Sequence, residues 1–154
     1  MAHVLETGFE ILNRENPNGS PTVMGYNIIN GELRPASDGE TFESRNPAWL
    51  DDCVGVFPLS TKEDVHDALI SAREAFSQWS QTPAPTRGQI IGNMGRLLMQ
   101  HKDDIVRVES REIGKTLKES AGEVQEAIDT CLFFQSEGRR LYGQTVNSEL
   151  PDKE

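Results

Sequence analysis

Helical periodicity dominates the chain after residue 60 and restricts its fold more than any other feature. Apolar residues recur there three or four positions apart, which places them on one face of each predicted helix. The first stripe runs from Val65 to Trp79, and prolines at positions 83 and 85 end it. Three further stripes follow: Ile90–Leu98, Ile105–Val108 and Val124–Leu132. We therefore expect about four amphipathic helices, with Gly114 ending the third and Gly143 the last.

Two segments have the pattern of a capping box, in which a hydroxyl and a carboxylate satisfy the free N–H groups at the start of a helix. The first pairs Ser60 with Glu63, and the second pairs Ser120 with Glu123. The pattern predicts that the first helix begins near residue 61 and that the last begins near residue 121.

Before residue 60 the pattern is that of short strands joined by tight turns. The Asn-Gly pair at 30–31 accepts the positive φ angles of a type I′ hairpin turn, and an Asp-Gly pair at 38–39 marks a second turn. The strand after that turn is expected to point Phe42 inward, and it ends at the Asn-Pro pair at 46–47 because proline cannot donate to a strand ladder. Extended segments are expected at three places: residues 26–29, 40–44 and 54–57.

The domain organisation follows from length and from the character of the N-terminus. A chain of 154 residues allows one domain of ordinary size. Residues 1–22 mix polar and small types with isolated apolar ones, so we expect a flexible arm there. The domain itself is expected over residues 23–154.

Strands followed by helices is an α+β order, but these helices have too little sheet to cover. Amphipathic helices need a broad apolar surface, and three short strands supply little of one. Either the helices pack against one another as a bundle, or the sheet they belong to lies beyond Glu154.

Charge excludes two classes of partner. Fifteen basic residues against 25 acidic ones give a net charge of −10, which opposes binding to nucleic acid and to anionic membrane surfaces. No apolar run approaches the ~18 residues of a spanning helix, and the first 20 residues lack the features of a signal peptide. We therefore expect a cytoplasmic protein with no nucleic-acid or membrane partner.

Residue types and spacing alone support no catalytic site. The sequence has no phosphate-binding glycine loop, dinucleotide fingerprint, zinc-protease motif or serine-nucleophile elbow. Cys131 lies on an apolar stripe and is expected to pack as a small hydrophobe. Glu119, Glu123 and Glu126 form an acidic stripe at a helix start, which the helix dipole favours. A new catalytic site around Glu119, Glu123 and Cys131 is therefore the least favoured hypothesis.

An ordered set of strings does carry a resemblance. The chain resembles the N-terminal portion of the aldehyde dehydrogenase superfamily over almost everything from Gly25 to Leu150. The stretch at 114–127 is most similar to the semialdehyde-oxidising branches. The strings that carry the resemblance occur in this order: GYNIINGE (25–32), NPA (46–48), AREAFSQW (72–79), PAPTRG (83–88), REIGKT (111–116) and ESAGEV (119–124).

The resemblance implies an α/β fold, in which the chain is the outer part of a doubly wound cofactor domain and is incomplete by itself. It implies an NAD- or NADP-dependent oxidation of a small aldehyde or semialdehyde through a cysteine thiohemiacetal, in a homo-oligomer (dimer or tetramer). The family's catalytic cysteine, base glutamate and dinucleotide turn come later than residue 154. The resemblance therefore assigns no catalytic or cofactor-binding residue to this chain, which is expected to be inactive alone.

Five residues receive roles from the resemblance. Ser44, Arg45 and Glu112 correspond to a monovalent cation site, in which backbone carbonyls and a carboxylate are the ligands. Glu123 and Ala127 correspond to the aldehyde tunnel. A carboxylate there would favour a substrate with an ammonium or hydroxyl group and would repel a dicarboxylic semialdehyde. Glu112 as an exposed helix-end carboxylate and Glu123 as a capping residue are the competing interpretations.

A second function remains open at this point. The chain would then be a stand-alone acidic interaction module that keeps the family's outer layer and assembles with a full-length paralogue. The two hypotheses differ in whether the apolar helix faces are buried within the chain itself.

Overall fold

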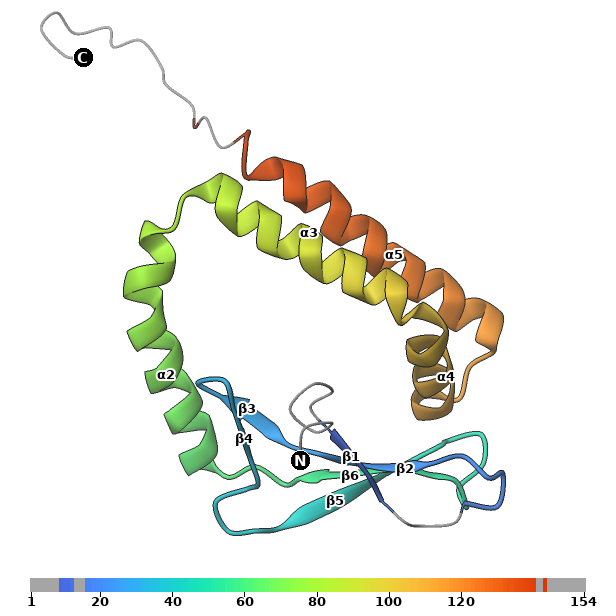
Figure 1. Cartoon of the computed structure of the whole chain (residues 1–154). Helices are drawn as coiled ribbons and strands as arrows, with labels where there is room; N and C mark the ends of the chain where they lie inside the picture. Colours follow the sequence, from blue (N-terminus) through green and yellow to red (C-terminus); the bar gives the residue numbers. More distant parts are fainter. Residues whose placement is uncertain (1–8, 13–15, 141–142, 144–154) are drawn as a thin grey trace, which may run out of the picture.

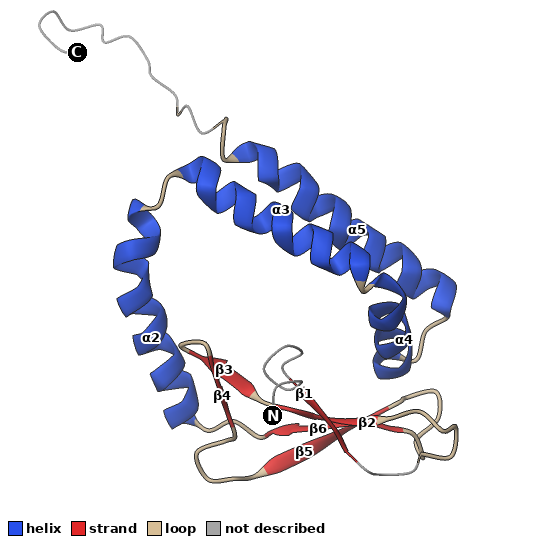
Figure 2. Ribbon diagram, viewed as in Figure 1, coloured by secondary structure: helices blue, strands red, loops and turns tan. Residues whose placement is uncertain are grey.

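The computed structural model describes residues 9–12, 16–140 and 143. Six short strands lie at one end of the molecule, and four helices form an arch above them (Figures 1 and 2). The strands are β1 (Phe9–Leu12), β2 (Thr22–Gly25), β3 (Asn27–Ile29), β4 (Glu32–Arg34), β5 (Thr41–Arg45) and β6 (Cys53–Pro58). The helices are α2 (Lys62–Gln81), α3 (Ala84–Gln100), α4 (Lys102–Ile113) and α5 (Leu117–Glu137).

The main sheet has the strand order β1-β2-β6-β5. β1 pairs antiparallel with β2, β2 pairs parallel with β6, and β5 pairs antiparallel with β6. β3 and β4 form the separate hairpin that the Asn-Gly pair predicts, and both turn residues have positive φ angles of 54° and 74°. The three predicted extended segments are confirmed within a residue or two, at β3, β5 and β6.

Part of the predicted N-terminal arm belongs to this sheet. β1 and the first residue of β2 lie within residues 1–22. Asn16 is buried, and its side chain accepts a hydrogen bond from the N–H of Cys53 at 2.9 Å and donates one to the carbonyl of Cys53 at 3.0 Å. From the sequence alone, an asparagine at this position predicts a loop, because the partner that it bonds is distant in sequence. Residues 1–8 and 13–15 of the arm lie outside the described residues.

Both capping boxes exist but at shifted positions, so the two predictions are wrong in detail. Thr61 and Asp64 cap α2, not Ser60 and Glu63. Thr116 and Glu119 cap α5, which therefore begins four residues earlier than predicted. Ser120 is instead fully buried.

The end of α5 and the environment of Phe42 also differ from the predictions. α5 ends at Glu137 rather than at Gly143, while Gly114 does end α4 in the left-handed conformation with φ of 73°. Phe42 is 47% exposed and packs on Phe57 with ring centroids 5.9 Å apart. β5 is an edge strand, so its side chains have a neighbour on one side only.

The helices do not close into a bundle. α3 and α5 lie side by side in opposite directions, and α4 returns from them to the sheet (Figure 1). The small core of Val106, Val124 and Ile128 lies between α4 and α5. α2 stands apart: of the other elements described, β3 is the one it contacts most. Its apolar stripe is exposed, at 65% for Leu69 and 64% for Phe76.

Glycines let α3 and α5 approach closely, which leads to a first prediction. A Cβ on Gly88 would lie 2.5 Å from the backbone carbonyl oxygen of Gln135, whereas the three atoms nearest to a Cβ on Gly92 all belong to the Gln135 side chain, which can move. Gly88→Ala should therefore lower the free energy of unfolding by about 1 kcal/mol, because crowding of about 1–3 kcal/mol exceeds the gain in helix propensity. Gly92→Ala should be neutral or stabilising by up to about 1 kcal/mol.

Urea unfolding of the two variants measures this difference directly. Equal effects of the two alanines would show that the α3–α5 backbones are not held this close.

Candidate functional site

The two predicted tunnel residues lie one turn apart on α5, and both are exposed. Glu123 is no longer the capping residue of the competing interpretation, because Glu119 has that role. Its carboxylate is instead paired with Lys115 Nζ. Lys115 lies just before α5, and its Nζ is also 3.7 Å from Glu109 Oε1 on α4.

These three charged groups set one another's protonation. The hydrogen bond from Lys115 lowers the pKa of Glu123. Burial, followed by the neighbouring Glu123, raises the pKa of Glu109. The Glu123 carboxylate raises the pKa of Lys115. Lys115 thus compensates the negative charge of Glu123, and the surface near Ala127 carries an ion pair instead of an isolated carboxylate.

The predicted cation residues lie at one corner of the fold. Ser44 and Arg45 end β5, where the pairing with β6 is irregular. Glu112 is exposed near the end of α4. Gly114 lets the two segments approach closely, because a Cβ at this position would lie only 2.7 Å from Pro47 Cγ. Arg45 directs its guanidinium to the carbonyl of Leu50 at 2.9 Å.

The described part of the chain contains no metal site built from side chains. No group of three or more His, Cys, Asp or Glu side chains there could hold a metal ion. A monovalent cation held mainly by backbone carbonyls needs no such group, so that prediction stays a prediction.

Among the described residues, no helix has the length and apolar character needed to cross a membrane.

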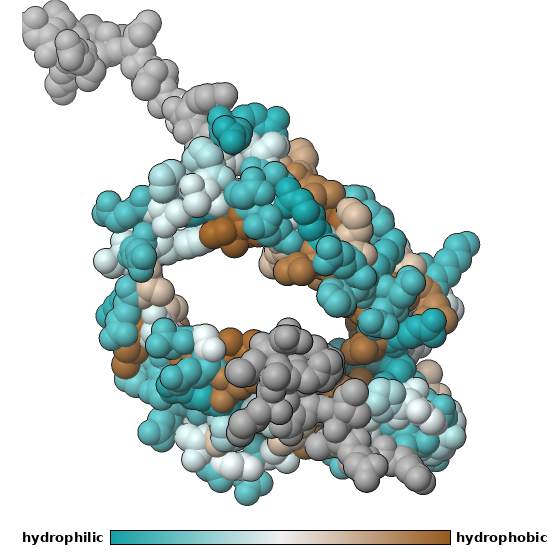
Figure 3. Space-filling model, in the orientation of Figure 1, coloured by the Kyte–Doolittle hydropathy of each residue, from teal (hydrophilic) through white to brown (hydrophobic). Residues whose placement is uncertain are grey.

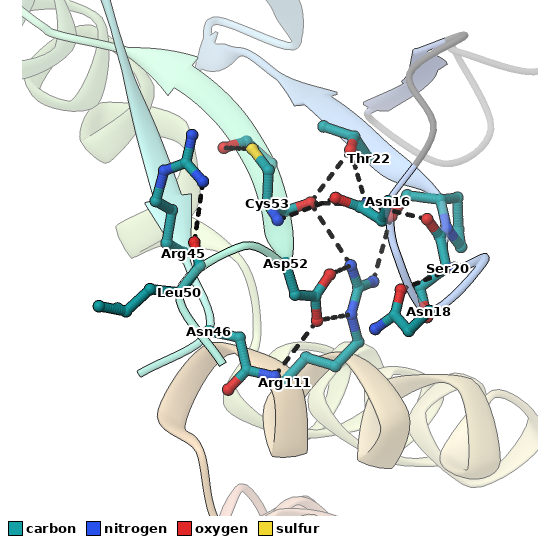
Figure 4. A network of polar contacts seen from close by, with 12 residues as sticks. Asn16, Asn18, Ser20, Thr22, Arg45, Asn46, Leu50, Asp52, Cys53 and Arg111 are labelled. Atoms are coloured by element: carbon teal, nitrogen blue, oxygen red, sulfur yellow. Dashed lines mark hydrogen bonds and ion pairs between the residues drawn. The ribbon is translucent and has the colours of Figure 1, made fainter. Parts of the chain in front are cut away.

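Asp52 and Arg111 form an ion pair whose carboxylate is fully buried, and the sequence pattern did not predict it (Figure 4). Arg111 Nη2 and Nε donate to the two carboxylate oxygens of Asp52 at 2.8 and 3.1 Å. Arg111 also donates to the carbonyl of Pro21 at 3.1 Å. One side chain of α4 thus fixes the helix to the start of β6 and to the segment before β2.

A second layer of hydrogen bonds supports that pair. Asn46 Nδ2 donates to Asp52 at 3.2 Å, and Thr22 Oγ1 donates to the carbonyl of Cys53 at 3.0 Å. Thr22 and Cys53 are buried, as is Asn16 beside them. This network lies between elements far apart in sequence and has the character of a structural joint. No local signal in the sequence singles out this pair, because the two residues are 59 positions apart.

Two carboxyl groups, one of them in this ion pair, are expected to make the stability of the fold depend on pH in the acid range. Hydrogen bonding to Arg111 lowers the pKa of Asp52, and the backbone N–H of Thr61 lowers the pKa of Asp64. A carboxyl whose pKa is lower in the folded state stabilises that state above its unfolded pKa of about 3.9. We expect this stabilisation to be complete above about pH 5 and to be lost as the pH falls through the folded pKa values.

Urea unfolding at a series of pH values between about 7 and 3 tests this expectation. Asp52→Asn should differ most from the unmodified chain at neutral pH and converge with it in acid. A difference that does not change with pH would contradict the charge-based explanation.

Comparison with known proteins decides the family. The aldehyde dehydrogenase family model matches residues 34–154. The chain belongs to this family. An α-ketoglutarate semialdehyde dehydrogenase of Haloferax volcanii is 37% identical over 126 residues, which are 82% of this chain and 26% of that protein. An NADP⁺-dependent succinate-semialdehyde dehydrogenase of Escherichia coli is 35% identical over 126 residues, which again are 82% of this chain and 26% of that protein.

Solved aldehyde dehydrogenases have the same fold over the shared part. A betaine aldehyde dehydrogenase of Staphylococcus aureus in complex with NAD⁺ superposes with a TM-score of 0.77 at 28% identity, covering 82% of this chain and 26% of that one. An NAD-dependent aldehyde dehydrogenase of Sinorhizobium meliloti gives a TM-score of 0.82 over 95% of this chain and 30% of that one, at 24% identity. The resemblance and the α/β fold are thus confirmed. This aldehyde dehydrogenase chain spans about a quarter of the length of its curated relatives.

Proposed function

We propose that the chain is the N-terminal segment of an NAD- or NADP-dependent aldehyde dehydrogenase. The whole protein would oxidise an aldehyde or semialdehyde to the carboxylic acid through a cysteine thiohemiacetal, with the hydride passing to the nicotinamide. The observation that carries this proposal is the match of 82% of the chain to about a quarter of each semialdehyde dehydrogenase. The catalytic cysteine, the base glutamate and the dinucleotide turn would belong to the other three quarters.

The segment itself would form the outer part of the cofactor domain. The exposed apolar stripe of α2 supports this role, because so much exposed apolar surface on one element is typical of a surface that another part of the protein covers. We propose that no residue of this chain binds the dinucleotide or reacts with the aldehyde. Homo-oligomerisation and a cytoplasmic location remain proposals for the whole protein.

A semialdehyde is the substrate class we propose. The curated relatives act on α-ketoglutarate, succinate and malonate semialdehydes by name, and these substrates carry a carboxylate. The repulsion expected from Glu123 is reduced by its ion pair with Lys115. If Glu123 and Ala127 line the aldehyde tunnel, this compensated charge admits an anionic substrate.

The same family resemblance supports a monovalent cation at Ser44, Arg45 and Glu112. The close packing of Gly114 on Pro47 supports it further, because it holds the end of β5 near the end of α4. Potassium and sodium titrations of the whole enzyme, with stability as the readout, would test this site.

Aldehyde-dependent formation of NADH or NADPH tests the proposed function. The isolated chain of 154 residues should give none with succinate semialdehyde. A longer protein that continues with the remaining three quarters of the family fold should be active. Turnover by the isolated chain, or an inactive longer protein with correctly folded domains, would contradict the proposal.

A further inference from the structure

Two Asn-Gly pairs occur in the chain, and their surroundings in the fold differ. Asn18–Gly19 lies in the loop before β2, and Asn30–Gly31 forms the turn between β3 and β4. In an Asn-Gly pair the backbone nitrogen of the glycine can attack the side-chain amide of the asparagine, because glycine has no Cβ to hinder the approach. The two pairs have similar intrinsic reactivity, so the fold decides which of them reacts.

The Asn18–Gly19 pair is held in place by hydrogen bonds. The N–H of Gly19, whose nitrogen would make the attack, donates to the carbonyl of Asn16 at 2.9 Å. The side-chain oxygen of Asn18 accepts the N–H of Ser20 at 2.9 Å (Figure 4). Asn16 is itself buried, because it lies against the start of β6. Attack at this pair therefore requires an anchored loop to break both hydrogen bonds.

The Asn30–Gly31 turn has no such restraints. Both residues are exposed, and among the described residues neither the Asn30 side chain nor the N–H of Gly31 forms a hydrogen bond. A Cβ on Gly31 would meet nothing within 4 Å, so the space around the attacking nitrogen is open. Figure 3 shows hydrophilic residues over the lower end of α2, beside which this hairpin lies. Water therefore has access to the turn.

The hairpin that carries this turn is also small. β3 and β4 have three residues each and form a two-stranded sheet separate from the main one. A two-stranded hairpin with little support is marginally stable in water, so its turn opens more readily than the core does. Asn30 has a φ of 54°, a left-handed conformation that residues other than glycine adopt at an energetic cost. Opening relieves this cost and lets the Gly31 nitrogen reach the side-chain carbon of Asn30.

We propose that Asn30 is a site of spontaneous deamidation and that the fold protects Asn18. The Gly31 nitrogen loses its proton and forms a bond to the side-chain carbonyl carbon of Asn30. The bond from that carbon to the amide nitrogen breaks, and the amide nitrogen leaves as ammonia with the proton. The cyclic imide then takes up one water molecule, which opens the ring at either carbonyl to give aspartate or isoaspartate. Nothing is oxidised or reduced, and the inference does not depend on the proposed function.

Either product changes the hairpin. Both place a negative charge next to Glu32, whose carboxylate already pairs with Arg34 at 2.6 Å. Isoaspartate also adds one carbon to the main chain, which disrupts a two-residue turn that sets Ile29 opposite Glu32. Arg34 lies 3.8 Å from Asp67 of α2. Deamidation is therefore expected to loosen both the hairpin and its contact with α2.

Peptide mapping by mass spectrometry tests the proposal on the intact chain in mildly alkaline buffer. Chymotryptic cleavage after Tyr26 separates the two pairs, and each peptide is followed for the mass increase that replacing NH₂ by OH produces. Asn30 should deamidate roughly 5- to 150-fold faster than Asn18, because each of the two hydrogen bonds at the Asn18 pair slows attack by a factor of roughly 2 to 12. In the urea-unfolded chain the two rates should become similar.

Glutamine substitutions provide the matched controls, because a longer side chain forms the cyclic imide far more slowly. Asn30→Gln should abolish the mass increase in its peptide, and Asn18→Gln should leave the Asn30 rate unchanged. After incubation, backbone amides of β3 and β4 should exchange hydrogen faster in the unmodified chain than in Asn30→Gln, while those of α5 should exchange alike.

Two results would overturn the proposal. The first is a folded chain in which Asn18 deamidates as fast as Asn30 or faster. The second is an Asn30 peptide that keeps its mass in the folded chain under conditions in which the unfolded chain deamidates. Unchanged hydrogen exchange in the hairpin after conversion of Asn30 would overturn the expected loosening.

Discussion

Replacing Asp52 with asparagine is expected to lower the free energy of unfolding by about 3–5 kcal/mol, the loss typical of a buried ion pair deprived of one partner. The Asp52 side chain is fully buried, and that of Arg111 is only 15% exposed. Asparagine keeps the shape of the residue but removes the charge that compensates the guanidinium. Urea unfolding at pH 7, followed by circular dichroism, measures the loss.

Asp51 provides the matched control for this substitution. It is the neighbouring residue and is exposed, so Asp51→Asn should change stability by less than about 0.5 kcal/mol. Combining Asp52→Asn with Arg111→Met should lower the free energy of unfolding by less than the sum of the two single changes, because each change removes the same interaction. Equal effects of the Asp51 and Asp52 substitutions would show that the joint between α4 and the sheet does not depend on this pair.

Local turn chemistry could be predicted from the sequence because it depends on neighbouring residues alone. The Asn-Gly pair determines the hairpin of β3 and β4, and a glycine ends α4. The sequence does not select the N-cap of α2, because Ser60 and Thr61 are both good capping residues. The choice of Thr61 depends on Asp64, whose carboxylate also accepts the N–H of Ser37 at 3.0 Å, 27 residues away.

Pairs distant in sequence set the limit of prediction for the candidate site. Asp52 and Arg111 are 59 positions apart, and among 25 acidic and 15 basic residues no local rule selects them. Lys115 and Glu123 are eight residues apart, which exceeds the spacing of three or four that joins side chains within one helix. Glu123 could therefore be named as a site residue from the family resemblance, but its ion pair could not.

Periodicity likewise could not tell a stripe packed within this chain from one left open. Leu69 on α2 and Ile128 on α5 belong to equally regular apolar stripes. Ile128 is fully buried in the core between α4 and α5, while Leu69 is 65% exposed. The difference arises from the arrangement of the helices, because α5 has α3 and α4 as neighbours and α2 stands apart.

Alanine substitution at these two positions should therefore have opposite outcomes. Ile128→Ala is expected to lower the free energy of unfolding by about 2–5 kcal/mol, through lost burial and the cavity left behind. Leu69→Ala should change it by less than about 0.5 kcal/mol in the isolated chain. In a complex with the remainder of the fold, Leu69→Ala should become destabilising, because the stripe is then covered. A loss of about 2 kcal/mol or more for Leu69→Ala in the isolated chain would place it among fully buried core residues, and α2 would then need no partner to cover it.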